Sequence, residues 1–313
     1  MTEFSEGIIL SCIGGRYTVL ADGMRFSCYA KGALRHAGIK PLCGDRVRFV
    51  KGACFKDDGT PLPPSTESDG YLCEVLPRTS LLRRPPIANI DTLLLVIAAA
   101  TPTPDTLFID RLTVCADLAK IQPIILINKC DLDEAETARI STIYQKAGFQ
   151  TYRISALQNS GIDLDGLRRL LEGKVTAMAG FSGVGKTTFF NRLFPNEKGA
   201  VGALSQKLSR GKNTTRTTEL HSLKRSILNV EGLFADTAGF SRLELSELNT
   251  LQPEELVYHF PDFDPYRTEC RFTKCTHQKE LDCAIRSAVD ANLISESRYR
   301  SFTALYQELK NNK

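Results

Sequence analysis

The segment from residue 180 to residue 187 constrains the fold of this chain most strongly. It reads Gly-Phe-Ser-Gly-Val-Gly-Lys-Thr and matches the phosphate-binding pattern G-x-x-x-x-G-K-S/T. An apolar run over 175–179 precedes the segment, and a predicted helix begins near Lys186. Because such a loop works between a buried strand and the helix that it opens, the segment predicts an α/β domain with a parallel sheet. The alternative is an ordinary glycine-rich turn before a helix.

The chemistry of a phosphate loop assigns roles to these residues. Its glycines let backbone N–H groups converge on phosphate oxygens, and the helix N-terminus adds partial positive charge. Lys186 is expected to reach the β- and γ-phosphates, and the Thr187 hydroxyl is expected to bind Mg²⁺. The predicted nucleotide-binding residues of the loop are Gly180, Phe181, Ser182, Gly183, Val184, Gly185, Lys186, Thr187 and Thr188.

A second polar segment, Asn128-Lys129-Cys130-Asp131, indicates the base. It follows the apolar strand predicted over 123–127, so it lies at the edge of the sheet where ligands bind. The Asp131 carboxylate can accept hydrogen bonds from guanine N1–H and the exocyclic amine, which adenine does not offer in that arrangement. Asn128 can bond another edge of the base, and the Lys129 stem can cover its face. Alone, the segment could be a polar turn after a strand.

Two further segments complete a predicted GTPase site. Ser155 and Ala156 end the next predicted strand and resemble the element whose backbone N–H contacts guanine O6. Asp236-Thr-Ala-Gly239 follows an apolar stretch, and Asp236 is expected to hold Mg²⁺ through water while the Gly239 N–H senses the γ-phosphate. Read together with the phosphate loop, these segments favour GTP over ATP and argue against a kinase.

The segment over 207–218 is polar and basic and fits a first switch. One of its threonines is expected to complete the Mg²⁺ shell; we favour Thr215, with Thr214 as the next choice. A solvated basic loop is the alternative. Phe240 stands where Ras-like enzymes carry a water-orienting glutamine, so intrinsic hydrolysis should be slow. Asn213 is the candidate for orienting water.

The order of these motifs predicts a circular permutation. In ordinary GTPases the phosphate loop precedes the base-specificity motif, whereas here Asn128 precedes Gly180. The permutation is physically tolerable because nucleotide contacts come from loops at one edge of a sheet, whatever the order of the chain. The chain leaves the segment around Asp236 directly toward its C-terminal part, so the nucleotide state could be transmitted there.

The remaining sequence predicts two flanking domains. Short strand-like runs before residue 80 favour a small β-barrel, interrupted by a polar loop over 52–70. Strands then alternate with helices over about 105–120 and 133–147, and a charged helix over 296–310 ends the chain. The predicted domains are 1–80, 81–243 and 244–313, the last mostly helical.

A metal site is predicted near the C-terminus. Cys270, Cys275, His277 and Cys283 can wrap one tetrahedral ion, and three thiolates with one imidazole leave no open position. The predicted ion is one structural Zn²⁺ per chain. A chance grouping of reduced cysteines with a surface histidine is the alternative.

Composition supports an intracellular protein. The formal net charge is +4, 42% of the residues are hydrophobic, and the apolar runs are too short to cross a bilayer. The N-terminus lacks the basic start of a signal peptide, so the ten cysteines predict reduced thiols or metal ligands. We expect a cytoplasmic monomer that does not bind membranes.

With these motifs in their order, the chain resembles the bacterial ribosome small-subunit-dependent GTPases, which are circularly permuted and take part in late assembly of the small ribosomal subunit. The resemblance also includes Gly44-Asp-Arg46 and Arg84-Pro-Pro-Ile-Ala-Asn89. It implies an N-terminal oligonucleotide-binding (OB) barrel, a central permuted GTPase and a zinc domain. The chain departs from the family at Asn213, where a histidine is common, and at Ala238, where proline is common.

The resemblance implies the 30S subunit and its 16S rRNA as partners, with GTP and GDP as nucleotides. Basic clusters agree with an RNA partner, because phosphate contacts use Lys and Arg. These clusters comprise Arg78, Arg83, Arg84, Lys207, Arg210, Lys212 and Arg216. A different hypothesis is a GTP-dependent switch acting on a protein partner, with no role for rRNA.

Overall fold

The computed structural model describes residues 4–51, 54–56, 70–83, 85–158, 161, 163–197, 218–235, 248 and 251–312. The chain divides into two compact units. Unit 1 takes its described residues from 1–92, 163–178 and 189–240. Unit 2 takes its described residues from 93–162, 179–188 and 241–313.

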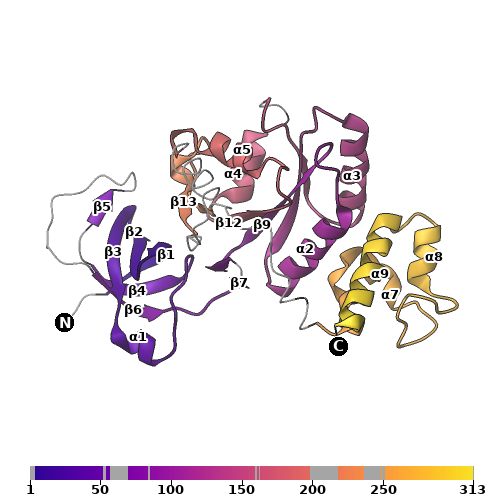
Figure 1. Ribbon diagram of the computed structural model, residues 1–313, viewed down its shortest axis with the longest axis horizontal. Coiled ribbons are helices and arrows are strands. Elements are labelled where there is room, and N and C mark those ends of the chain that lie inside the picture. Colours follow the sequence, from indigo (N-terminus) through magenta and orange to yellow (C-terminus); the bar gives the residue numbers. More distant parts are fainter. Residues whose placement is uncertain are drawn as a thin grey trace, which may run out of the picture. The chain divides into compact units, whose positions relative to one another are not determined.

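A closed five-stranded barrel forms the N-terminal part of unit 1 (Figure 1). Its strands are β1 (Ser5–Ile13), β2 (Arg16–Ala21), β3 (Met24–Ala30), β4 (Arg46–Val50) and β6 (Gly70–Val75). β1 pairs with β2 and β4, β3 pairs with β2 and β6, and β4 pairs with β6, so the ladder returns to its start. The β3–β6 pair is parallel and the others are antiparallel. The predicted barrel is confirmed.

The barrel closes because alternate residues of its strands are apolar. Val19, Val47 and Phe49 are fully buried in its core. Two short elements differ from the sequence prediction. α1 (Gly32–His36) follows β3, and β5 (Cys54–Lys56) pairs with β3 inside the segment predicted as a loop over 52–70.

The rest of unit 1 holds part of an α/β fold. β12 (Val175–Ala179) pairs in parallel with β14 (Leu233–Ala235), which pairs antiparallel with β13 (Leu220–Ser222). The other elements are the hairpin β7 (Leu81–Arg83) and β8 (Pro86–Ala88), the helices α4 (Leu164–Leu171) and α5 (Lys186–Leu193), and the 3₁₀ turns η1 (Pro195–Glu197) and η3 (Leu223–Arg225).

Unit 2 begins with the other α/β strands, in the order β11-β10-β9. They are β9 (Thr92–Ala98), β10 (Gln122–Asn128) and β11 (Thr151–Arg153), joined by α2 (Thr106–Leu118) and α3 (Glu134–Lys146). Both helices begin where an aspartate caps them: Asp105 accepts from the Phe108 N–H and Asp133 from the Glu136 N–H. The predicted helices over 105–120 and 133–147 are thus confirmed.

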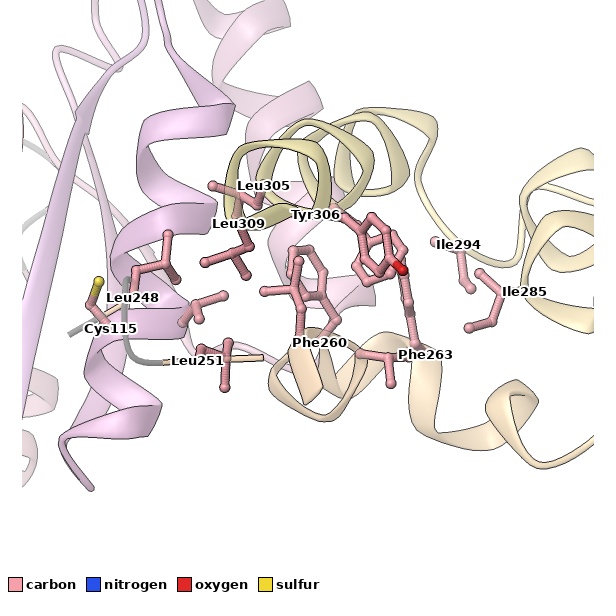
Figure 2. Close-up of a cluster of buried hydrophobic side chains, with 14 of the residues drawn as sticks. Cys115, Leu248, Leu251, Phe260, Phe263, Ile285, Ile294, Leu305, Tyr306 and Leu309 are labelled. Atoms are coloured by element: carbon pink, nitrogen blue, oxygen red, sulfur yellow. The ribbon is translucent and has the colours of Figure 1, made fainter. Parts of the chain in front are cut away.

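The C-terminal part of unit 2 is helical. It comprises η6 (Pro253–His259), η7 (Pro261–Phe263), α7 (Asp264–Arg267), α8 (Ala284–Asp290) and α9 (Glu296–Asn311). Figure 2 shows its core, in which Leu305 and Leu309 of α9 lie in one cluster with Leu248 and with Cys115 of α2. This apolar core packs α9 against α2.

Polar contacts join the same two helices. Arg298 of α9 is fully buried and donates to Asp110 of α2 at 2.7 Å and to Asp262 at 2.7 Å. Arg111 of α2 donates to both carboxylate oxygens of Glu308. None of the described helices combines the length and the apolarity needed to cross a bilayer.

Candidate functional site

The phosphate loop lies between β12 and α5, as predicted. Gly185 has a φ of +98°, and a Cβ placed there would lie 2.2 Å from the Asn128 Nδ2 atom. A side chain at this position is therefore excluded both by the backbone conformation and by the approach of Asn128. The loop requires glycine here because Asn128, at the end of β10, packs directly against it.

The Asn128 side chain at the end of β10 bonds the phosphate loop and the 155–156 turn. It is 2% exposed at the end of β10. Its Nδ2 donates to the Val184 carbonyl at 2.8 Å, and its Oδ1 accepts from the Ala156 N–H at 3.0 Å. The predicted contact of Asn128 with the base stays a prediction; in the structure its amide connects the phosphate loop with the 155–156 turn.

Two lysines approach the phosphate loop from different elements. The Lys186 Nζ donates to the carbonyls of Gly180 and Phe181, both at 2.7 Å. The Lys129 Nζ donates to the Thr101 carbonyl and, at 2.8 Å, to the Gly183 carbonyl. Burial lowers the pKa of Lys186 to about 8. An anionic phosphate beside this ammonium would restore the charge that burial disfavours.

The other predicted nucleotide contacts differ in exposure. Asp131, Thr187 and Thr188 are exposed, whereas Ser155 and Ala156 are buried. The Cys130 thiol is half-buried, and burial raises its pKa. Asp131 and Thr187 are thus accessible to a ligand, whereas Ser155 and Ala156 are each 1% exposed and the Ala156 N–H already donates to Asn128.

A ring contact that the sequence did not reveal supports the phosphate loop. Phe181 of the loop lies against Phe108 of α2, with ring centroids 4.1 Å apart. Phe108 follows the Asp105 cap of α2 by one helical turn. Such a contact could not be inferred from sequence, because the two residues stand far apart in the chain and neither belongs to a pattern that pairs them.

Several predicted residues lie outside the described part of the chain. They are Asn213, Thr214, Thr215, Asp236, Gly239 and Phe240, together with Arg84, Lys207, Arg210, Lys212 and Arg216. Two members of the predicted basic clusters are described: Arg83 is exposed at the end of β7, and Arg78 has a structural partner. Arg78 donates to both carboxylate oxygens of buried Asp45, at 2.7 and 2.8 Å.

The predicted metal ligands converge in the loop between α7 and α8. The ligand atoms of Cys270, Cys275, His277 and Cys283 all lie within 4.8 Å of one another. The His277 Nδ1 is 3.5 Å from the sulfurs of Cys270 and Cys283, and those sulfurs are 3.9 Å apart. Zinc bonds of ordinary length in a tetrahedron give N···S about 3.5 Å and S···S about 3.8 Å. The donor set fits a Zn²⁺ ion.

The environment of these ligands disfavours the charged forms of two of them. Burial raises the pKa of Cys275 to about 12 and lowers the pKa of His277. A bound dication would supply the positive charge that lets thiolates exist in such a buried place. Cys270 and Cys275 also pack against the core shown in Figure 2, so the loop is anchored to the helical part.

One carboxylate organises this loop. Glu280 accepts hydrogen bonds from the backbone N–H groups of Thr276, Gln278 and Lys279 and from the Thr276 hydroxyl. Burial alone would raise the pKa of Glu280, but these hydrogen bonds hold it at about 2. The side chain is therefore an ionised acceptor at neutral pH.

Comparisons with known proteins agree with this architecture. The sequence model of the RsgA GTPase matches residues 75–246, and that of the RsgA N-terminal domain matches residues 6–53. The protein named small ribosomal subunit biogenesis GTPase RsgA from Geobacillus kaustophilus is 37% identical over 99% of both chains. The protein named small ribosomal subunit biogenesis GTPase RsgA 2 from Listeria innocua is 36% identical, and the match covers 98% of both chains.

Solved structures give the same answer. The structure of YloQ, described as a circularly permuted GTPase, has a TM-score of 0.75 and 31% identity, covering 99% of this chain and 96% of its own. YjeQ from Thermotoga maritima has a TM-score of 0.76 and 29% identity, covering 98% of this chain and 99% of its own. The phosphate loop, the order of the motifs and these matches lead to one conclusion: the chain belongs to the RsgA family of circularly permuted GTPases, which hydrolyse GTP.

Proposed function

We propose that this GTPase assists the late maturation of the small (30S) ribosomal subunit and that the subunit stimulates its hydrolysis of GTP to GDP and phosphate. Relatives that match it over nearly their whole length are named for biogenesis of that subunit. The observation that carries the proposal is the convergence of Asn128, Val184 and Ala156, which assembles one nucleotide site from three separate segments.

Within this proposal, the phosphate loop binds and orients GTP. Backbone N–H groups of residues 180–188 hold the phosphates, and Lys186 neutralises charge that develops on the β- and γ-oxygens. Thr187 and Asp236 would hold Mg²⁺, which would supply electrostatic stabilisation of the phosphates. Thr215 and Gly239 respond to the γ-phosphate, and Asn213 orients the attacking water.

The base is read by Asp131. Its exposed carboxylate accepts from the two donors of guanine, while the Lys129 stem covers the ring. Asn128 acts chiefly by holding the phosphate loop and the Ser155–Ala156 turn at the spacing that one nucleotide needs. Cys130 contributes backbone to the same segment.

The C-terminal site is proposed to hold one structural Zn²⁺ through Cys270, Cys275, His277 and Cys283. Four protein ligands leave no position for a reacting water, so the ion stabilises the loop and takes no part in hydrolysis. We keep 1–80, 81–243 and 244–313 as the proposed functional domains, in a cytoplasmic monomer.

The barrel is proposed to contact 16S rRNA. Arg16 of β2, Tyr29 of β3 and Tyr71 of β6 are neighbours in register across the outer face, and both tyrosine rings are exposed. The Arg16 guanidinium donates to the Tyr29 hydroxyl at 2.9 Å. Exposed aromatic rings beside a cation suit stacking of unpaired bases and contact with phosphate.

A sedimentation experiment tests the proposed partner. The full chain is centrifuged with purified 30S subunits in the presence of a non-hydrolysable GTP analogue or of GDP. We expect it to pellet with the subunits in the GTP-analogue state and much less with GDP, and binding should weaken as salt rises. Failure to pellet in either state would contradict a role on the subunit and would favour a protein partner.

A further inference from the structure

The metal-binding loop contains a ligand in an unusual backbone conformation. His277 has a φ of +60°, in the left-handed region that side-chain-bearing residues seldom adopt. This conformation accompanies the placement of its Nδ1 atom 3.5 Å from the sulfurs of Cys270 and Cys283. Something must hold the histidine there, because the conformation is unfavourable by about 1 kcal/mol or more.

The Glu280 carboxylate spans this histidine. Its Oε1 accepts from the Thr276 N–H at 2.8 Å and from the Thr276 hydroxyl at 2.5 Å, on one side of His277. Its Oε2 accepts from the Gln278 N–H at 2.9 Å and from the Lys279 N–H at 3.1 Å, on the other side. Both oxygens are therefore used, and the residues before and after His277 are fixed to one rigid group.

We propose that Glu280 is a positioning residue that holds His277 in its metal-binding conformation and so sets the affinity of the site for Zn²⁺. The inference rests on the proposed zinc site. It differs from a general stabilising role because Glu280 bonds the backbone that flanks a ligand. A second contact supports the placement: the Tyr299 hydroxyl of α9 donates to the His277 carbonyl at 2.8 Å.

The donor pattern demands a carboxylate. Each oxygen accepts from two donors, so an amide in the same place would turn one oxygen into an NH₂ group that faces two N–H or O–H donors. Glutamine is therefore nearly isosteric, but its NH₂ group faces at least one backbone N–H donor, so at least one hydrogen bond is lost and two donors are set against each other. Aspartate keeps the charge but is one methylene too short to reach both sides of His277.

The test measures Zn²⁺ affinity of the full chain by competition with a chromophoric chelator. We expect Glu280→Gln to raise the dissociation constant for Zn²⁺ by about ten- to a hundredfold, the usual effect of removing a group that orients a metal ligand. Co²⁺ substituted at saturation should keep the absorption spectrum of a three-sulfur, one-nitrogen site, because all four ligands remain. Glu296→Gln, which loses an exposed carboxylate paired with Arg300, is the matched control and should bind Zn²⁺ normally.

A second pair of variants keeps the inference testable if Glu280→Gln does not fold. Thr276→Ala removes one of the four donors and should weaken Zn²⁺ binding by a smaller factor, whereas Thr276→Ser should restore it. If Glu280→Gln binds Zn²⁺ as tightly as the unaltered protein, or if Glu296→Gln loses as much affinity as Glu280→Gln, Glu280 does not position His277. Either result would leave the zinc site itself in place. Absence of Zn²⁺ binding by the unaltered protein would overturn the metal site and this inference together.

Discussion

At the scale of single residues, Lys186 bears most directly on hydrolysis. Its ammonium is held beside the carbonyls of Gly180 and Phe181, where the phosphates of a bound nucleotide are expected. We predict that Lys186→Ala lowers the GTP hydrolysis rate by about a hundredfold or more, as loss of a preorganised charge at a reacting phosphate does. Phosphate release measures the rate, and Lys224→Ala, which alters an exposed lysine paired with Glu231, is the control. Near-normal turnover in Lys186→Ala would refute the phosphate-loop assignment.

The same lysine makes nucleotide binding depend on pH. Because burial lowers its pKa to about 8 in the nucleotide-free protein, about half of the molecules carry the charge at pH 8, nearly all of them below about pH 7 and few above about pH 9. Bound phosphates raise that pKa, so GDP affinity should be nearly constant below about pH 7, begin to fall toward pH 8, and approach a loss of about tenfold per pH unit above it. Calorimetric titration from pH 7 to pH 9 measures this. Lys186→Arg should show no such fall, since arginine stays charged, and an equal fall in both proteins would contradict the account.

Asp131 is predicted to decide the base. Xanthine carries a carbonyl where guanine carries the exocyclic amine, so an amide at residue 131 can donate to it where a carboxylate cannot. We expect Asp131→Asn to weaken binding of GTP and to strengthen binding of XTP. Competition between the two nucleotides measures the change, and unchanged affinity for GTP would count against the base-reading role.

At the scale of elements, the phosphate loop depends on its packing against β10. Gly185→Ala would force a Cβ against the Asn128 side chain at a positive φ. Strain of this kind is about 1–3 kcal/mol, so GDP affinity should fall roughly ten- to a hundredfold while the barrel stays folded. Gly32→Ala, where an added Cβ meets nothing within 4 Å, should bind GDP normally. Equal affinity of both variants would show that the loop does not need this approach.

The pairing of α2 with α9 rests on a buried charge. Arg298 is fully buried between Asp110 and Asp262, and the rings of Phe149 and Phe260 flank its guanidinium. Arg298→Ala leaves two carboxylates without their cation and should destabilise unit 2 by about 3–5 kcal/mol. Urea unfolding followed by helix content measures the loss, with Arg300→Ala, an exposed ion pair, expected within about 0.5 kcal/mol of the unaltered protein. Similar stabilities would remove this ion group as the link between the helices.

Elements with their own local signals could be predicted from the sequence. α2 and α3 carry aspartate caps at Asp105 and Asp133, and the strands of the barrel are short strand-like runs separated by turn residues. The elements that sequence reasoning missed, such as α1 and β5, are three to five residues long. Such short elements form because of tertiary contacts. Their sequences are therefore too short to show a helical or strand period.

At the scale of the whole molecule, the local motifs could be recognised from the sequence, but the contacts between distant segments could not. The phosphate loop and the Cys/His set are local patterns whose spacing follows from phosphate and metal geometry. In contrast, the Asn128–Val184 bond joins residues 56 positions apart, and the Arg298–Asp110 pair joins residues 188 positions apart. No pattern within one segment specifies such pairs, so the support of the site became visible only in three dimensions.

The proposed action of this GTPase on the small ribosomal subunit is tested by the rate of GTP hydrolysis of the full chain with and without purified 30S subunits. We expect slow intrinsic turnover that rises by roughly tenfold or more with subunits, as partner-supplied groups achieve in other GTPases, and no rise with Lys186→Ala. A rate that purified subunits leave unchanged, in a preparation that hydrolyses GTP, would refute the proposed action on the subunit.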